Sequence, residues 1–190
     1  NYLWFCDEDY DRLKGRVKCN PAVKGAADRE ALRKGLAEGV IDTIGSDHAP
    51  HLLSEKEAPY LRCPSGLPSI QQSLAVVLTA ADIFNKGKED SRRLTLSRIA
   101  SAFSERPAEI LGIKDRGSLK AGNFADLVVI DPDREYSVAD SAYKCAWSPY
   151  DGTPLRSRID RVFLNGRQVV TSALPVISSP AALPLTFTGS

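Results

Sequence analysis

The stretch VIDTIGSDHAPH, residues 40–51, contains an aspartate and both histidines of the chain within five positions. Asp47 follows an apolar run, and His48 and His51 stand three positions apart. In a parallel α/β sheet or barrel, reactive side chains lie at the carboxyl ends of the strands, where the following loops begin. A carboxylate at such a place can bind a metal ion or transfer a proton.

The same spacing also has a plainer interpretation. Asp47 would then be a turn or helix-cap residue, and the two histidines would be surface groups or hydrogen-bonded buried groups. Two histidines and one aspartate in a loop cannot by themselves complete a tetrahedral zinc site. The residue types raise the hypothesis of an active site, and spacing alone leaves both interpretations open.

The element that must position Asp47 is a strand over residues 40–45, a β-branched run of strand length. Before it, Asp28 is placed to cap a helix that continues to about Glu38, and Gly39 is placed to end that helix. A helix, a glycine stop, an apolar strand and a polar loop in this order are typical of an α/β unit with parallel strands.

The loop over residues 46–68 is long and rich in His, Pro and Gly, and loops of this length are usually functional or disordered. Helical spacing of apolar residues then predicts two helices, with Ser104 placed to cap a third that has Pro107 in its first turn and ends at Gly112. The apolar positions of the first two are Ile70, Leu74, Val77, Leu78, Ala81 and Phe84, then Leu96, Ile99, Ala100 and Phe103.

Near residue 115 the character of the sequence changes to short strands and turns. Residues 125–130 form an apolar run that ends at Asp131-Pro132, and Asn165-Gly166 between apolar residues is the strongest hairpin signal in the chain. Residues 173–190 are low in charge and rich in Pro, Ala and Ser, which predicts an extended or disordered arm.

The composition is that of an ordinary globular protein, with 43% hydrophobic and 26% charged residues and a formal net charge of +1. No basic block indicates a nucleic-acid or membrane partner, and the longest apolar stretch, residues 74–81, is far shorter than a bilayer span. We therefore expect a soluble, cytoplasmic protein. Four widely spaced cysteines predict free thiols. A chain that starts at Asn1 and lacks methionine is expected to be part of a longer protein.

Several motifs together resemble the dihydroorotases, members of the amidohydrolase superfamily. SDHAPH after an apolar strand is similar to their signature, and KCNPAVKGAADREALRKGLAEGVIDTIG resembles the family's Asn-Pro segment, helix and final barrel strand. SERPAEILGI, GSLKAGNFADLVVID and VFLNGRQVV are similar to the segment that leaves the barrel. The resemblance covers about residues 1–170.

The resemblance implies an α/β fold in which residues 1–114 are the C-terminal part of a metal-dependent (β/α)₈ TIM-type barrel. Residues 115–172 would form a small β-sandwich module, and residues 173–190 would be the C-terminal arm.

The resemblance also assigns roles to individual residues. Asp47 matches the aspartate of the last barrel strand, which contacts one metal ion and carries a proton from the attacking hydroxide to the leaving amide nitrogen. His51 matches a histidine that binds the substrate's carboxylate, and Asn20 matches a residue that contacts the dihydropyrimidine ring. The loop residues that would hydrogen-bond the ring's amide edge are Pro64, Ser65 and Gly66. We expect a structural or supporting role for His48.

The implied cofactor is zinc, two ions per intact active site. The family's other ligands are a His-x-His pair, a carboxylated lysine and two further histidines, and the only two histidines here, His48 and His51, belong to the last-strand motif. The isolated segment should therefore be inactive. The resemblance implies a small-molecule substrate and a homodimer or higher homo-oligomer of the intact protein, with no nucleic-acid or membrane partner.

The implied reaction is the reversible hydrolysis of L-dihydroorotate to N-carbamoyl-L-aspartate in pyrimidine biosynthesis. One alternative is another cyclic amidase, a dihydropyrimidinase, hydantoinase or allantoinase, and His51 argues against it because those relatives usually lack this histidine. Another is a non-catalytic structural subunit, which the presence of Asp47, His51 and Asn20 disfavours. The family often reads Asn-Pro-Pro-Leu-Arg where this chain has Asn20-Pro21-Ala22-Val23-Lys24, and NYL replaces a more usual His-His-Leu. These departures weaken the assignment of substrate contacts to the residues near them.

Overall fold

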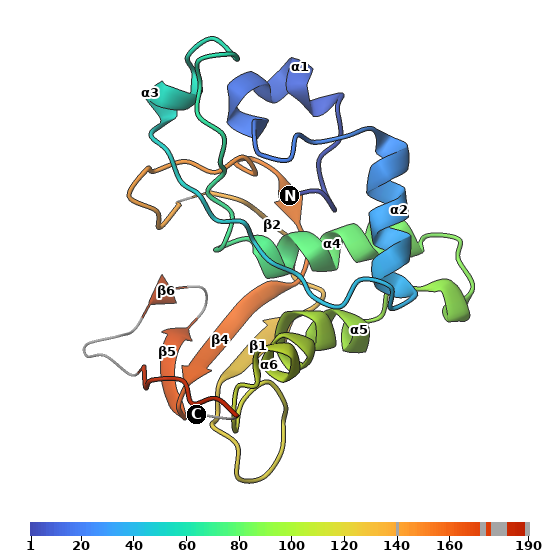
Figure 1. The fold of residues 1–190 in the computed structure, drawn as a ribbon, viewed down its shortest axis with the longest axis vertical. Helices are drawn as coiled ribbons and strands as arrows, with labels where there is room; N and C mark the ends of the chain where they lie inside the picture. Colours follow the sequence, from blue (N-terminus) through green and yellow to red (C-terminus); the bar gives the residue numbers. More distant parts are fainter. Residues whose placement is uncertain (140, 172–173, 176–181, 189–190) are drawn as a thin grey trace.

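A computed structural model of the chain describes residues 1–139, 141–171, 174–175 and 182–188 (Figure 1). Helix α4 (Ser73–Asn85) lies at its centre and is crossed by α2 (Ala26–Ala37). The four-stranded antiparallel sheet lies on one side of α4, and α1 (Asp9–Leu13) and the short α3 (Leu53–Lys56) lie on the other. The chain therefore combines helices and loops from its first part with a sheet from its second.

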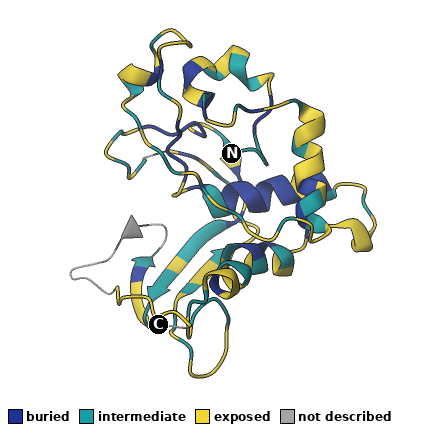
Figure 2. Ribbon diagram, in the orientation of Figure 1, coloured by how far each residue is buried: buried dark blue, intermediate teal, exposed yellow. Residues whose placement is uncertain are grey.

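Helix α4 is apolar on nearly all its faces, and Figure 2 shows it as the most continuous buried element. A helix with this pattern must be packed on several sides. Its first turns contribute Ala75 and Val76 to one core cluster, and its later turns contribute Val77, Leu78 and Ala81 to a second. The first cluster also contains Phe5, Val17, Cys19, Val23, Leu67, Val138, Tyr150 and Leu155. The second also contains Leu36, Phe84, Leu94, Ile99 and Ala102.

The helix predicted before the strand is present as α2, with small differences at its start. It begins after Gly25, whose extended backbone takes the N-cap position without a side-chain cap, so the predicted capping by Asp28 is wrong. Asp28 lies in the first turn, where a carboxylate is favourable beside the helix N-terminus. Leu36 is fully buried against α4, and Gly39 has a φ of 80° just beyond the helix end, as predicted.

The strand predicted over residues 40–45 is not formed. A strand requires a neighbouring ladder, and among the described residues this region makes a single parallel bridge, His48 with Leu67. The extended segment is instead held by side chains and single backbone bonds. The Ile44 amide donates to the Ala102 carbonyl at 3.0 Å, and Arg98 donates to the carbonyls of Leu36 and Ile41.

The later helices are present but differ in their boundaries. Helix α4 starts at Ser73, and the expected core residue Ile70 is 60% exposed. The structure then has a short 3₁₀ turn, η2 (Asp90–Arg92), followed by α5 (Leu96–Ala100), η3 (Ser101–Glu105) and α6 (Arg106–Leu111).

The segments α5, η3 and α6 follow one another without a break, and η3 is one π-helical turn. Thr95 caps α5 by accepting a hydrogen bond from the Arg98 amide. Ser104 lies within η3, so its predicted capping role is wrong. Pro107 has no N–H to continue the regular bonding, which accounts for the altered turn before α6. Gly112, with a φ of 65°, ends α6 as predicted.

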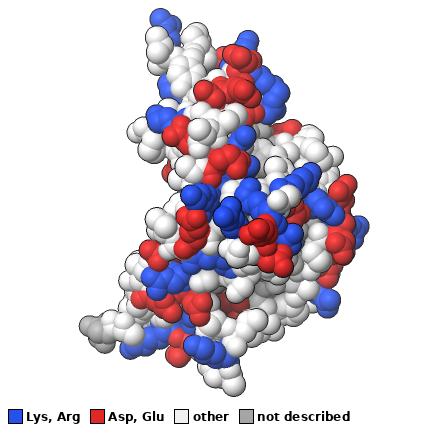
Figure 3. Space-filling view, turned by 90° about the vertical axis from the view of Figure 1, so that its right-hand side faces the viewer, with Lys and Arg blue, Asp and Glu red and all other residues white. Residues whose placement is uncertain are grey.

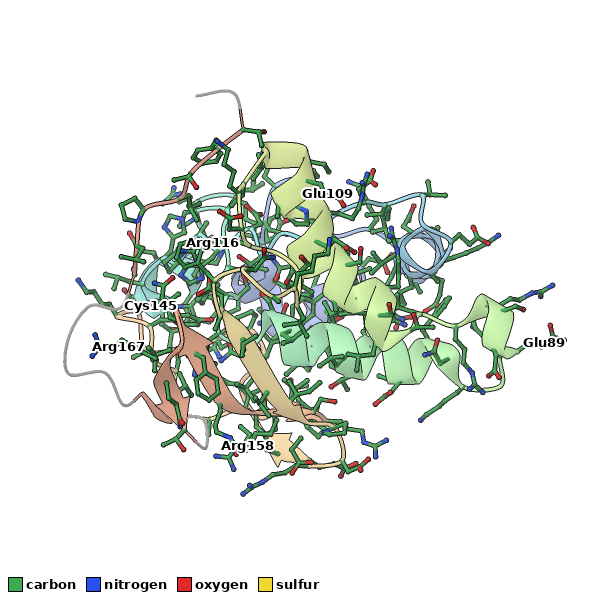
Figure 4. The ribbon with its side chains drawn as sticks, turned by 90° about the horizontal axis from the view of Figure 1, so that it is seen from below. Glu89, Glu109, Arg116, Cys145, Arg158 and Arg167 are labelled. Carbon is green, nitrogen blue, oxygen red and sulfur yellow. The ribbon has the colours of Figure 1, made fainter. Side chains whose placement is uncertain are left out.

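The second part of the chain forms a four-stranded antiparallel sheet in the order β1-β4-β5-β6. Its strands are β1 (Leu127–Asp131), β4 (Arg158–Leu164), β5 (Arg167–Thr171) and β6 (Leu174–Pro175). The predicted hairpin joins β4 to β5 through Asn165 and Gly166, whose φ values are 51° and 78°. Arg116, labelled in Figure 4, contacts Asp126 and donates to the Asn165 side chain at 2.9 Å, which ties the turn to the loop before β1.

A second sheet, separate from the first, consists of two strands: β2 (Tyr136–Ser137) pairs with β3 (Pro154–Leu155). Leu155 is fully buried in the same core cluster as Phe5 and Val17. Tyr150 stacks on Phe5 with ring centroids 5.1 Å apart. The segment around β2 and β3 therefore packs on the N-terminal part of the chain.

The described residues after β6 lie along the end of α6. Phe187 forms an antiparallel bridge with Ile113, and the Thr188 amide donates to the Gly112 carbonyl at 2.7 Å. Residues 173, 176–181 and 189–190 of the predicted arm lie outside the described residues. All four cysteines are free, as predicted. None of the described helices has the length and apolar character needed to cross a bilayer.

Charges of both signs are mixed on the face shown in Figure 3. Ion pairs such as Arg106 with Asp42 at 2.8 Å and Lys34 with Glu38 at 3.8 Å contribute to this mixing. The arrangement agrees with the net charge of +1.

Candidate active site

Asp47 ends the extended segment that follows α2 and is exposed to solvent. Its φ of 49° is unusual for a residue other than glycine, and short polar residues such as aspartate tolerate it best. Burial, Cys19 and the Asp47 carboxylate all raise the pKa of Tyr2, so this phenol stays neutral. The Tyr2 hydroxyl donates to the Pro21 carbonyl at 2.6 Å. Asp47 is thus close to the segment that carries Asn20.

The His48 side chain makes hydrogen bonds and a ring contact within the protein. Its Nδ1 accepts hydrogen bonds from the backbone amides of Ser69 and Ile70, at 3.1 and 3.4 Å, just before α4 begins. Its ring also contacts the ring of Tyr143, with centroids 4.8 Å apart. Because Nδ1 is already an acceptor for two amides, the described contacts give His48 the structural role expected of it.

His51 lies against the loop that the sequence assigned to substrate binding. Its Nε2 is 3.2 Å from the Ser65 carbonyl, and its Nδ1 is 3.9 Å from the Glu55 carboxylate. The His51 backbone carbonyl accepts a hydrogen bond from the Trp147 indole at 2.8 Å. With a third of its side chain exposed, the ring can still meet a ligand at this surface.

The loop containing Pro64, Ser65 and Gly66 approaches the SDHAPH segment closely. Gly66 has a φ of 139°, and a Cβ there would lie 2.5 Å from the Ala49 carbonyl oxygen. Next to it, the Ala49 amide donates to the Leu67 carbonyl at 3.0 Å. Only glycine satisfies both the backbone conformation and this approach.

Asn20 is exposed on the neighbouring segment. The Gly66 amide donates to the carbonyl of Lys18, two residues before Asn20, at 3.0 Å. Backbone contacts therefore link the segment that carries Asn20, the 64–66 loop and His51. The Asp47 carboxylate acts electrostatically on Tyr2, whose hydroxyl bonds the Pro21 carbonyl next to Asn20.

Three residues of this region are not apparent from the sequence. Tyr143 and Trp147 contact the two histidines from a segment about a hundred positions further along the chain. Lys56 is fully buried, although it lies in the polar run SEKE, and it donates to the carbonyls of Lys18 and Pro64. No local pattern predicts these contacts, because they depend on how distant segments pack.

The described residues contain no group of three or more His, Cys, Asp or Glu side chains that could hold a metal ion. The exposed Asp47 carboxylate can supply one oxygen ligand, whereas His48 Nδ1 is occupied by amides. Catalytic zinc sites use about three protein ligands. The donor set fits a metal site to which this chain contributes one ligand.

The chain is similar to known proteins over most of its length. Residues 8–169 match the family model described as "Amidohydrolase family". The dihydroorotase of Halobacterium salinarum is 35% identical over 154 residues, 80% of this chain and 35% of that protein. The dihydroorotase of Lactiplantibacillus plantarum is 35% identical over 169 residues, 88% of this chain and 38% of that protein. The chain thus spans little more than a third of the length of either relative.

Among solved structures, an L-hydantoinase (dihydropyrimidinase) from Arthrobacter aurescens superimposes with a TM-score of 0.83 at 30% identity, covering 93% of this chain and 39% of that one. A D-hydantoinase superimposes with a TM-score of 0.79 at 25% identity, covering 92% of this chain and 39% of that one. The expected fold class is confirmed, since the chain is a partial α/β segment of the barrel fold of these enzymes. By the extent of the family match, the chain belongs to the amidohydrolase family.

Proposed function

We propose that this chain is the C-terminal part of a dihydroorotase, which reversibly hydrolyses the cyclic amide of L-dihydroorotate to N-carbamoyl-L-aspartate in pyrimidine biosynthesis. The observation that carries the proposal is the contact between His51 and the 64–66 loop, at 3.2 Å between Nε2 and the Ser65 carbonyl oxygen. An imidazole beside backbone groups of a loop suits a flat ring that has an amide edge and a carboxylate. The similarity to two curated dihydroorotases supports the same assignment.

In this proposal the Asp47 carboxylate accepts a proton from the attacking water and donates it to the leaving amide nitrogen. Zinc, when bound, would polarise the carbonyl and acidify the water. Asp47 is the residue of this chain that would hold the metal, and the remaining ligands would come from a segment outside these 190 residues. Its exposed position leaves the carboxylate accessible to both metal and substrate.

His51 would bind the ring carboxylate of the substrate. Its Nε2 now faces the Ser65 carbonyl, so substrate binding requires the ring to exchange this contact for the carboxylate. The Glu55 carboxylate lies 3.9 Å from Nδ1 of the same ring. Asn20 and the backbone at residues 64–66 would hydrogen-bond the rest of the ring.

The second candidate is another cyclic amidase, a hydantoinase or dihydropyrimidinase, which the structural likeness to enzymes of those names favours. The two functions differ in whether the substrate ring carries a carboxylate, and this is the group proposed for His51. We also propose a homodimer or higher homo-oligomer in the cytoplasm. The division at residues 114/115 and 172/173 stays a prediction.

The deciding experiment uses the full-length protein that contains this chain. Bound metal is measured by elemental analysis, and hydrolysis of L-dihydroorotate is followed beside hydantoin and allantoin. Close to two zinc ions with selective dihydroorotate turnover is the expected result. Preferred turnover of hydantoin or allantoin would favour the second candidate, and a metal-free inactive protein would point to a non-catalytic subunit.

For Asp47, we expect the Asp47→Asn variant to lose about a thousandfold in kcat, because a positioned acid–base group contributes roughly 10²–10⁴-fold. Metal content should stay largely unchanged, since other residues supply most of the ligands. Steady-state kinetics and elemental analysis on the same sample test both points. Asp42→Asn is the matched control, because Asp42 is an exposed carboxylate of the same segment, paired with Arg106. Wild-type kcat in Asp47→Asn would refute the assignment.

For His51, we expect the His51→Asn variant to raise KM for dihydroorotate about ten- to a hundredfold, as loss of a hydrogen bond to a charged group implies. Its kcat should change much less, because the ring acts in binding. Dihydrouracil, which lacks the carboxylate, is the control substrate. An equal loss with both substrates would show that His51 does not recognise the carboxylate.

A further inference from the structure

Lys56 is a fully buried lysine at the end of α3. Burying an ammonium group is costly unless hydrogen bonds replace its water shell. Among the described residues, no carboxylate lies within ion-pair distance of its Nζ. Its Nζ donates to two backbone carbonyls, Lys18 at 2.9 Å and Pro64 at 2.7 Å.

These two carbonyls belong to the two sides of the proposed substrate pocket. Lys18 is two residues before Asn20, and Pro64 begins the loop that contacts His51. The Lys18 carbonyl also accepts from the Gly66 amide at 3.0 Å. The Lys56 ammonium therefore joins two segments more than forty positions apart in the sequence, at the place where both approach the site.

The backbone around Lys56 is also closely fitted. A Cβ at Gly15 would lie 2.1 Å from the Lys56 carbonyl oxygen and 2.9 Å from the Cys63 sulfur. The absence of a side chain at Gly15 lets α3 rest on the 3₁₀ turn η1 (Lys14–Val17). Burial lowers the pKa of Lys56, while the neighbouring Cys63 and Cys19 act in the opposite direction.

Lys18 fixes the other end of the same loop. Its Nζ donates to the carbonyls of Tyr60 and Cys63, both at 2.7 Å, and lies 4.9 Å from the centre of the Tyr60 ring. The two lysines thus bond carbonyls at residues 60, 63 and 64. Lys18 is itself part of the Asn20 segment, so its side chain also joins the two sides. Lys56 differs because it bonds both sides from a third segment, α3.

We propose that Lys56 is a positioning residue, which fixes the spacing between the Asn20 segment and the 64–66 loop and thereby sets substrate affinity. The inference rests on the proposed function, because it assumes that these two segments bind the substrate ring. Lys56 itself contacts neither the ring nor the reacting atoms in this assignment.

The test uses Lys56→Met in the full-length enzyme, since methionine has a similar length and no donor. We expect KM for dihydroorotate to rise about ten- to a hundredfold, with kcat within about threefold of the wild-type value. Lys120→Met is the control, because Lys120 is exposed and its side chain forms no hydrogen bond or ion pair with the residues that the structure describes. Lys56→Gln, which keeps a shorter neutral donor, should give an intermediate KM and decides the matter if the methionine variant does not fold.

Amide hydrogen exchange supplies a readout that is independent of activity. Exchange at Gly66 should become at least about tenfold faster in the Lys56 variants, while Val76 in α4 should keep its protection. A lowered melting temperature with unchanged KM and unchanged Gly66 exchange would reduce Lys56 to a packing residue and overturn the proposal. If the wild-type enzyme does not hydrolyse dihydroorotate, the proposed function fails, and Gly66 exchange still decides whether Lys56 holds the loop.

Discussion

At the scale of single residues, the side chains of Asp47, His48 and His51 have different surroundings although they lie within five positions of one another. Asp47 is exposed, His48 bonds the backbone before α4, and His51 lies against the 64–66 loop. His48 Nδ1 accepts from the amides of Ser69 and Ile70, whereas His51 Nε2 faces the Ser65 carbonyl. The difference explains why one histidine is assigned to the structure and the other to the substrate.

Gly66 gives a prediction at this scale. We expect Gly66→Ala to destabilise the folded protein by about 2 kcal/mol or more, because overpacking costs roughly 1–3 kcal/mol and its φ of 139° adds strain. The nearest atoms that a methyl group would meet are backbone and Cβ atoms of Ala49, which cannot move aside easily. Urea unfolding of the wild type and the variant measures the difference.

The control for Gly66 is Gly122→Ala. Gly122 also has a positive φ, 95°, but a Cβ there would meet nothing within 4 Å. This variant therefore isolates the cost of the backbone conformation, about 1–2 kcal/mol. Equal destabilisation by the two substitutions would show that the contact with Ala49 contributes nothing.

The sequence was sufficient to single out Asp47, His51 and the 64–66 loop as a group, and the structure gathers the loop around His51. It was not sufficient for Lys56 or Trp147. A lysine in a polar run and a tryptophan far along the chain acquire these contacts through tertiary packing, which local spacing does not encode. The roles themselves stay predictions.

At the scale of elements, the patterns with strong local causes were predicted best. Helix α2, helix α4 and the Asn165-Gly166 hairpin follow from apolar periodicity and from turn residues that favour positive φ. The exposed Ile70 shows the limit, because a periodic apolar residue can lie one turn outside the helix. Element type was therefore more predictable than element ends.

Two elements could not be predicted locally. The segment 40–45 has strand composition, but a strand depends on a partner, and its described contacts are with the helical segments α2, α5, η3 and α6 instead. The π-helical turn between α5 and α6 lies just before Pro107. Proline is accepted in the first turn of α6, but it has no N–H to donate to the preceding helical turn. In both cases the outcome depends on the neighbours of the segment.

At the scale of the whole molecule, the fold class could be predicted from the sequence. The two parts of the chain on either side of residue 115, however, share a hydrophobic core. Strands β2 and β3 come after residue 115, yet Val138, Tyr150 and Leu155 pack in one core with Phe5 and other N-terminal residues. Trp147 and Tyr143 reach the two histidines from this same segment. The later part of the chain therefore supports the candidate site directly.

The molecule as a whole yields a prediction about metal binding. Expressed alone, these 190 residues should retain far less than one zinc ion per chain after dialysis, because a catalytic zinc needs about three protein ligands and Asp47 is the single ligand assigned here. Elemental analysis measures the content, with the full-length protein as the positive control and Asp47→Asn in the isolated chain as the negative one. Stoichiometric zinc in the isolated chain, unaffected by Asp47→Asn, would mean that this segment has a metal site of its own and that the proposed division of ligands is wrong.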